Sequence, residues 1–155
     1  MKLDAIIAAP FGQLGLAADQ GTLTGIEFLL EPRPLKKPVS SLLKETEAQL
    51  AAYFKNPAHV FTLPMQLHGT PFQQRVWQAL CEIPAGAPWT YGQLAKILAT
   101  APRAVGGACG SNPLPIVVPC HRIVSATGIG GFMHTRELKP LNIKSWLLAH
   151  EHKNG

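Results

Sequence analysis

The segment PIVVPCHRIV, residues 115–124, places three chemically active side chains in a row: Cys120, His121 and Arg122. A cysteine attacks as its thiolate, so it needs a neighbour that accepts its proton or stabilises the negative charge. His121 is adjacent, but neighbours on an extended chain point to opposite faces. A direct contact therefore requires a bent backbone, and an indirect one a bridging water. Taken alone, Cys120 is more often a buried packing residue, so a nucleophile and a packing residue both stay open here.

The other cysteines, Cys81 and Cys109, make an odd total of three with no close spacing. This pattern predicts neither a disulfide framework nor a zinc site, and it is typical of a reducing compartment. We expect Cys81 to lie in the core on an apolar helix. Cys109 is expected near the reactive segment, with packing as its main role.

Two further patterns are weak. The stretch AVGGACGSNP, residues 104–113, is glycine-rich but lacks the Gly-Lys-Ser/Thr ending of a phosphate loop, so it predicts close helix packing. His150 and His152 flank Glu151, but this spacing is poor for a metal site. We therefore predict no metal.

Composition and charge describe a compact protein with an uneven charge distribution. The 155 residues are 46% hydrophobic and 15% charged, and the net charge is +5. Residues 1–65 hold six basic and six acidic side chains, whereas residues 66–155 hold eight basic and three acidic ones. A basic half indicates a polyanionic partner such as nucleic acid, although an ordinary, mildly basic soluble domain fits equally well. The N-terminal residues predict a strand and not a signal peptide, and no run predicts a membrane span, so we expect a cytoplasmic protein.

The first part of the chain, residues 1–65, predicts a small α/β domain. Three strand-like runs, KLDAIIAA, QLGLAA and TLTGIEFLL, are separated by the turn signals PFG and DQG, which indicates an antiparallel meander. After a proline-punctuated connection, a helix is expected to open at Ser41, with Leu43, Leu50 and Phe54 at helical spacing. The extended piece HVFTLPM ends this part.

The second part, residues 66–155, predicts a helix-rich domain. Capping boxes at Thr70 and Thr90, each with glutamine three residues later, predict two helices. After the turn ATAP, a third short helix from Arg103 to Cys109 should complete a helix-turn-helix. PIVV is expected to be a short buried strand and LNIKSWLLAHE a final helix. The predicted class is α/β, with a small N-terminal antiparallel sheet and a helix, followed by a winged-helix-like C-terminal domain.

The stretches GTPFQQRVWQALCEIPAGAPWTYGQLA, RAVGGACGSNPLPIVVPCHRIV and WLLAHE resemble the C-terminal domain of the O6-alkylguanine-DNA alkyltransferases, over most of residues 69–151. The resemblance implies direct reversal of DNA damage. The alkyl group of O6-alkylguanine, and also of O4-alkylthymine, would pass once to the protein's own cysteine after nucleotide flipping. It implies no cofactor and a double-stranded DNA partner bound through the minor groove. It is compatible with a monomer that clusters on DNA.

The resemblance also assigns catalytic roles. Cys120 resembles the acceptor thiol, His121 the base that takes its proton through a water, and Glu151 the group that orients the imidazole. Asn112 resembles the residue that ties the recognition helix to the active segment. Tyr91 resembles the phenol that donates a proton to N3 of the leaving guanine.

Further residues are assigned to DNA and to the substrate pocket. Arg103 resembles the side chain inserted where the damaged nucleotide rotates out of the duplex. The implied DNA contacts are Tyr91, Arg103, Ala104, Gly107 and Arg122, and the implied pocket residues are Ile123, Gly131, Phe132 and Met133. Backbone groups at Cys120 and Ile123 are expected to read the guanine edge. Each side chain also has an ordinary structural role open to it, but their joint occurrence around PCHR favours function.

The sequence departs from the family after residue 131. GGFMHTRELKPLNIK replaces a short glycine-rich loop, Phe132 stands where tyrosine is common, and Met133 replaces a small, often hydroxyl-bearing residue. A missing donor at the guanine oxygen is expected to slow transfer or change the preferred adduct unless a backbone amide substitutes. The turn ATAP is also shorter than usual, which affects where Arg103 lies.

Two other functions remain as alternatives. One is a non-enzymatic lesion binder resembling the alkyltransferase-like proteins, which lack the acceptor cysteine. The other is a cysteine hydrolase using Cys120 and His121, which requires an oxyanion site that the sequence does not reveal.

Overall fold

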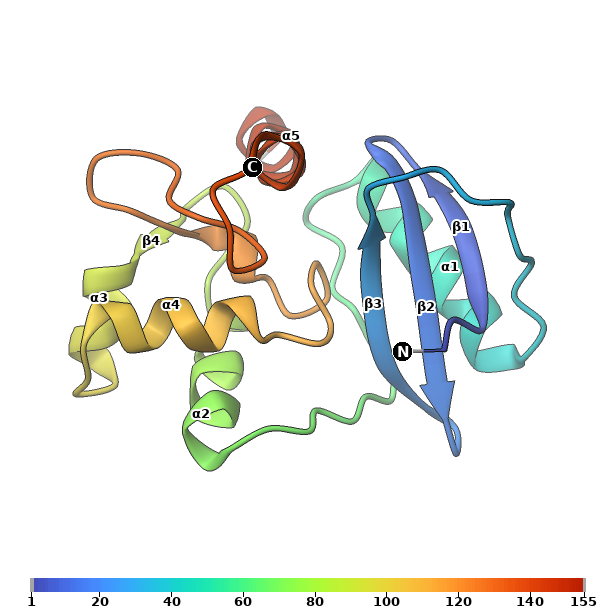
Figure 1. Ribbon diagram of the computed structural model, residues 1–155, viewed down its shortest axis with the longest axis horizontal. Coiled ribbons are helices and arrows are strands. Elements are labelled where there is room, and N and C mark those ends of the chain that lie inside the picture. Colours follow the sequence, from blue (N-terminus) through green and yellow to red (C-terminus); the bar gives the residue numbers. More distant parts are fainter. Residues whose placement is uncertain (1, 155) are drawn as a thin grey trace. The chain divides into compact units, whose positions relative to one another are not determined.

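The computed structural model describes residues 2–154, with side chains through His152, and the chain forms two compact units (Figure 1). One unit ends at Leu67 and the other begins at His68. The predicted class is confirmed: a three-stranded antiparallel sheet with one helix comes first, and a helix-rich unit follows. No helix in the described part of the chain is long and apolar enough to cross a bilayer.

The sheet of the first unit is a meander of β1 (Ala5–Ala9), β2 (Gly12–Asp19) and β3 (Thr22–Leu29), in that order. The second hairpin turns through Gln20 and Gly21, whose φ angles are 48° and 79°. Positive φ at both central residues gives a turn whose twist matches that of the flanking strands. The predicted DQG turn is therefore confirmed.

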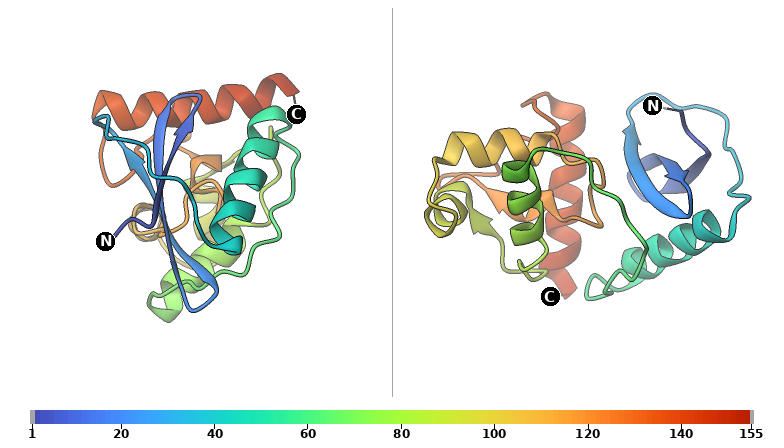
Figure 2. Two further views of the ribbon diagram at one scale, coloured as in Figure 1. Left: turned by 90° about the vertical axis from the view of Figure 1, so that its right-hand side faces the viewer. Right: turned by 90° about the horizontal axis from the view of Figure 1, so that it is seen from below.

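Helix α1 (Ser41–Lys55) covers one face of this sheet, as Figures 1 and 2 show. It begins at Ser41 as predicted, and the hydroxyl of the preceding Ser40 caps it by accepting from the backbone N–H of Leu43 at 3.2 Å. Leu43 and Leu50 are buried as predicted, and the Phe54 ring meets Phe11 edge-on with 5.8 Å between centroids.

Two capping boxes start the helices α2 (Pro71–Leu80) and α3 (Tyr91–Ile97) of the second unit. Thr70 accepts from the backbone of Gln73 at 3.1 Å, and the Gln73 side chain accepts from the backbone of Thr70 at 2.9 Å. Thr90 and Gln93 repeat this geometry at 3.1 and 2.8 Å. Both sequence predictions are confirmed, and Tyr91 is fixed as the first residue of its helix.

Helix α4 (Pro102–Gly110) follows a four-residue turn after α3 and packs against both α2 and α3. The buried indole of Trp77 on α2 donates to the carbonyl of Ala108 on α4 at 2.8 Å. The strands β4 (Trp89–Thr90) and β5 (Ile123–Val124) pair in parallel. Helix α5 (Leu138–Asn154) begins three residues earlier than the predicted Leu141.

Two sequence predictions are wrong in this unit. Residues 115–118 form a tight turn and not a strand: Ile116 has φ of 75° and Val118 donates to the Leu114 carbonyl at 2.8 Å. Pro113, Pro115 and Pro119 lack N–H groups, so this run cannot supply a continuous ladder. Cys81 is exposed, because it caps the end of α2, where the chain leaves the apolar stripe.

Candidate active site

Cys120 lies in a bent segment, which brings it and His121 to the same buried region. Residues Cys120–Arg122 form a single 3-10 turn, in which Arg122 donates its backbone N–H to Pro119 at 3.0 Å. The alternation of an extended chain is therefore broken, and both Cys120 and His121 are buried, at 7% and 0% exposure. The bend places both residues in one buried region, and a water is still needed to link the thiol to the imidazole.

The His121 imidazole is held by a buried carboxylate from the far end of the chain. Its Nε2 lies 2.7 Å from Oε2 of Glu151 on α5, and Glu151 is only 1% exposed. The other ring nitrogen, Nδ1, is buried and has no hydrogen-bond partner among the residues that the structure describes. A neutral ring that donates from Nε2 to the carboxylate keeps Nδ1 as an acceptor, which is the form that a general base needs.

Arg122 holds the same carboxylate from the other side. Its Nε and Nη2 donate to the two Glu151 oxygens at 2.9 and 3.0 Å, and its Nη1 donates to the Ile83 carbonyl at 2.7 Å. All three nitrogens of the guanidinium are thus used inside the protein. Arg122 therefore positions Glu151, and the DNA contact expected from the sequence stays a prediction.

Burial sets the resting protonation of the pair. It raises the pKa of the Cys120 thiol, an effect opposed in part by a hydrogen bond from Asn112 and by the Lys144 ammonium. Burial also lowers the pKa of His121 below 6.5, although the Glu151 carboxylate opposes this shift. At neutral pH the site therefore holds a protonated thiol beside a neutral imidazole, so attack requires removal of the thiol proton.

Asn112 fastens the loop that carries Cys120. Its side-chain N–H donates to the Val118 carbonyl at 2.7 Å, and its Oδ1 accepts from the Leu114 backbone at 3.0 Å. Because Asn112 lies two residues after the end of α4, these bonds join that helix to the cysteine segment, as the resemblance implied.

Tyr91 is placed as a neutral hydroxyl donor. It is the first residue of α3, and its O–H donates to the Gly131 carbonyl at 3.4 Å. Burial raises the pKa of Tyr91 to about 12, so the phenol keeps its proton at physiological pH. A Cβ on Gly130 would come within 2.9 Å of the ring, and Gly130 also has φ of 78°, so glycine is needed there twice over.

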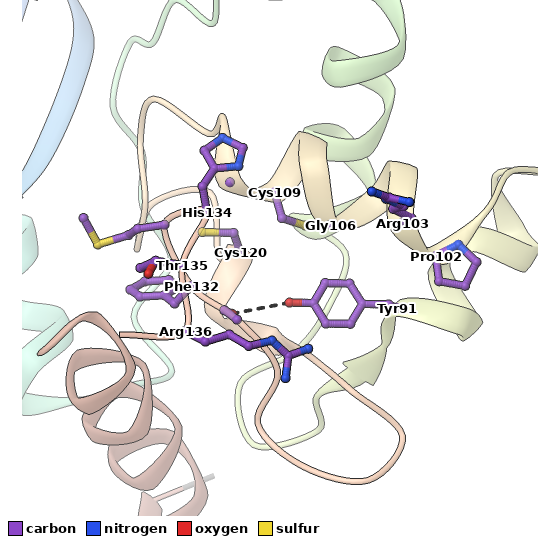
Figure 3. A pocket seen from close by; sticks show the side chains of 13 residues that line it. Tyr91, Pro102, Arg103, Gly106, Cys109, Cys120, Phe132, His134, Thr135 and Arg136 are labelled. Atoms are coloured by element: carbon purple, nitrogen blue, oxygen red, sulfur yellow. Dashed lines mark hydrogen bonds between the residues drawn. The ribbon is translucent and has the colours of Figure 1, made fainter. Parts of the chain in front are cut away.

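A cavity of about 430 Å³ opens beside Cys120, and Figure 3 shows Tyr91 and Arg103 across it from the cysteine. Of the expected pocket residues, Gly131, Phe132 and Met133 line it, together with Tyr91 and Arg103. The side chain of Ile123 is fully buried away from the cavity. The rest of the lining comes from α4 and the loop before α5: Pro102, Gly106, Cys109, Gly110, His134, Thr135 and Arg136.

Arg103 is the second residue of α4 and is exposed at the cavity, so the short ATAP turn still brings it to the site. Ala104 and Gly107 lie on the same helix outside the cavity lining; Ala104 is half-buried and Gly107 is exposed. Among the described residues, no group of three His, Cys, Asp or Glu side chains is arranged to hold a metal.

Lys144 on α5 also lies at the site, although the sequence did not single it out. It is 1% exposed, donates to the Gly131 carbonyl at 2.8 Å and lies 5.7 Å from the centroid of the Tyr91 ring. Burial lowers the pKa of Lys144 to about 8, an effect that the sulfurs of Cys120 and Cys109 oppose when ionised. Its spacing could have indicated burial, because Lys144, Leu147 and Glu151 lie on one face of the helix and Leu147 is apolar.

The chain is similar to proteins of one family. A family model described as 6-O-methylguanine DNA methyltransferase, DNA binding domain, matches residues 71–153. A methylated-DNA–protein-cysteine methyltransferase from Methanosarcina mazei is 39% identical, over 96% of each chain. A probable methylated-DNA–protein-cysteine methyltransferase from Acanthamoeba polyphaga mimivirus is 42% identical, over 99% of each.

Solved structures agree with this similarity. The Mycobacterium tuberculosis O6-methylguanine methyltransferase superposes with a TM-score of 0.82 at 35% identity, covering 99% of this chain and 95% of the other. The M. tuberculosis OGT in complex with DNA gives a TM-score of 0.81 at 34% identity, covering 97% and 93%.

Proposed function

Because the chain belongs to the O6-methylguanine DNA methyltransferase family, we propose that it repairs DNA by transferring the alkyl group of O6-alkylguanine to Cys120. One observation carries this proposal: Cys120 lines a cavity, and the next residue, His121, is a buried imidazole hydrogen-bonded to Glu151. This is the nucleophile, base and orienter arrangement of an activated thiol.

The reaction is a single displacement. Cys120 loses its proton through one water to Nδ1 of His121, and its sulfur attacks the alkyl carbon in line with the bond to O6. The S–C bond forms as the C–O6 bond breaks, and the electron pair of that bond stays on the guanine. Tyr91 donates its proton to N3 as negative charge develops on the leaving base, and the proton held by His121 passes through solvent to restore the Tyr91 phenol.

Lys144 supports the charge on sulfur. Its ammonium opposes the effect of burial on Cys120, and it is held in place by the Gly131 carbonyl. The same carbonyl accepts from Tyr91, so one backbone group positions the cation beside the nucleophile and the donor beside the leaving group. The cation favours the thiolate more than the thiol, and it therefore lowers the barrier to attack.

The target carbon is inaccessible in stacked DNA, so the nucleotide must leave the duplex. Helix α4 enters the minor groove, with Ala104 and the exposed backbone at Gly107 close to the phosphates and sugars. Arg103, at the start of this helix and at the mouth of the cavity, fills the space that the flipped nucleotide leaves.

The thioether product does not hydrolyse, so each molecule reacts once. The test is the stoichiometry of repair: excess duplex with O6-methylguanine is incubated with a known amount of protein, and repaired guanine is counted. We expect one repaired base for each protein molecule, with no later turnover. Tight binding of the lesion without repair would support the lesion binder, and continued turnover would support the hydrolase.

Arg103→Ala is expected to slow repair of duplex DNA by about tenfold, because flipping loses the side chain that replaces the base in the stack. Reaction with free O6-methylguanine base should change little, since that substrate needs no flipping. The measurement is the ratio of the two single-turnover rate constants. Lys96→Ala removes an exposed cation of α3 outside the cavity and is the control. Equal losses on both substrates would contradict the role of Arg103.

A further inference from the structure

The cavity is bordered by a tight hairpin turn with an unusual composition. Phe132 and Thr135 exchange backbone hydrogen bonds of 2.9 and 3.0 Å, so Met133 and His134 are the two central residues of the turn. Their φ angles are 54° and 61°. Such turns ordinarily use asparagine, aspartate or glycine. Met133 and His134 therefore adopt a left-handed backbone that is sterically unfavourable for their side chains.

The His134 ring is seated on the end of α4. A Cβ built on Gly110 would lie 2.5 Å from Cε1 and 2.7 Å from Cγ of this exposed ring, so the ring would have to shift to admit a side chain at position 110. Gly110 is not among the described residues with positive φ, and its backbone is that of an ordinary helix. Glycine at position 110 therefore leaves room for the ring in this position, whereas the backbone there does not call for glycine.

A hydrogen bond fixes the ring in this seat. Nε2 of His134 lies 3.2 Å from the hydroxyl of Ser111, and that hydroxyl donates its proton to the Gly107 carbonyl of α4 at 3.2 Å. His134, Gly110 and Ser111 thus join the hairpin tip to the helix that carries Arg103. We call these three residues the clasp.

The clasp closes the cavity on the side of the nucleophile. Gly110, Met133 and His134 line the cavity together with Cys120, and Figure 3 shows the His134 imidazole beside the two cysteines while Tyr91 lies across from them. Guanine, which must reach Tyr91 with its ring, leaves its alkyl group near Cys120 and hence near this wall.

We propose that the clasp limits the length of the alkyl group that Cys120 accepts. This inference rests on the proposed transfer reaction and adds the residues that set its adduct range. A methyl group fits beside the sulfur without touching the wall, whereas a butyl chain must displace the seated ring. Displacing it breaks the bond to Ser111, so long adducts react more slowly.

The test uses identical duplexes with O6-methyl-, O6-propyl- or O6-butylguanine, and the readout is the single-turnover rate for each. His134→Gly removes the ring and relieves the positive φ, so the butyl-to-methyl rate ratio should rise by about tenfold. Ser111→Ala should raise this ratio less, because the His134 ring remains but loses its hydrogen bond to the Ser111 hydroxyl. Gln20→Gly makes the same backbone change at a positive-φ residue of the first unit and should leave the ratio unchanged.

A stability cycle reports on the contact independently. Gly110→Ala should lower the urea midpoint in the native sequence, where the new Cβ meets the ring, and raise it in His134→Gly, where alanine simply favours the helix. If His134→Gly does not fold, His134→Asn, which tolerates positive φ but is too short to reach the seat, gives the same comparison.

The outcomes separate the two proposals. Absence of methyl transfer by the native protein would refute the proposed function itself. Normal methyl transfer with an unchanged butyl-to-methyl ratio in the His134 variants would overturn the clasp as a limit on adduct length. A higher ratio together with the reversal in the stability cycle supports it.

Discussion

Glu151→Gln is expected to slow alkyl transfer by about 10³–10⁴-fold, the largest effect of any substitution that leaves the sulfur in place. The carboxylate accepts from His121 at 2.7 Å and twice from Arg122. An amide has one acceptor oxygen for these three bonds, and its N–H₂ group must face a donor. The imidazole is then driven to the tautomer with hydrogen on Nδ1, which cannot take the proton of Cys120.

The measurement is the single-turnover rate on methylated duplex, with folding checked by circular dichroism. Breaking a buried ion pair costs about 3–5 kcal/mol, so stability is measured for the same sample. Glu82→Gln, which neutralises an exposed carboxylate after α2, is the control and should react normally. A folded Glu151→Gln protein that repairs at the native rate would contradict the relay.

Lys144→Met is expected to slow transfer by about a hundredfold at neutral pH, because the thiolate loses the cation that favours it. Methionine fills a similar volume, so the loss reports on charge and on the hydrogen bond to Gly131. Lys139→Met changes an exposed lysine of the same helix and is the control. The rate on free methylated base should fall as much as on duplex, which distinguishes this effect from that of Arg103.

The pH profile gives a second test of Lys144. His121 must be neutral to accept a proton, and its pKa is lowered below 6.5, so the rate should rise with pH only below that value. The pKa of Lys144 is lowered to about 8, so the ammonium is lost and the rate falls as pH rises through about 8. In Lys144→Met this alkaline fall should disappear. An unchanged alkaline limb in the variant would assign it to another group.

Local chemistry explains which elements the sequence could predict. The capping boxes at Thr70 and Thr90 are confirmed because each is a short-range pattern closed by two side chains three residues apart. The turn at Gln20 and Gly21 is local in the same way. The reactive segment could be recognised from PCHR, but its bent shape depends on prolines and on Asn112, which break the strand that its apolar residues suggested.

Long-range contacts explain what the sequence did not reveal. The sequence did not show that Arg122 binds Glu151, which lies 29 positions later in the chain. Lysine is ordinarily a surface residue, and Lys144 is buried because α5 packs against the cysteine segment through the face that also carries Leu147 and Glu151. The seat of His134 on Gly110 likewise joins residues that no periodic pattern connects.

The most direct test of the account is the mass of the protein after reaction. The native chain is incubated with a duplex containing one O6-methylguanine, and intact-mass and peptide mass spectrometry follow, with Cys120→Ser as the control. We predict that one methyl group replaces one hydrogen, that it maps to Cys120, and that the control gains nothing. Complete repair with the native protein unmodified, or with the methyl group on Cys109 or Cys81, would contradict the central claim.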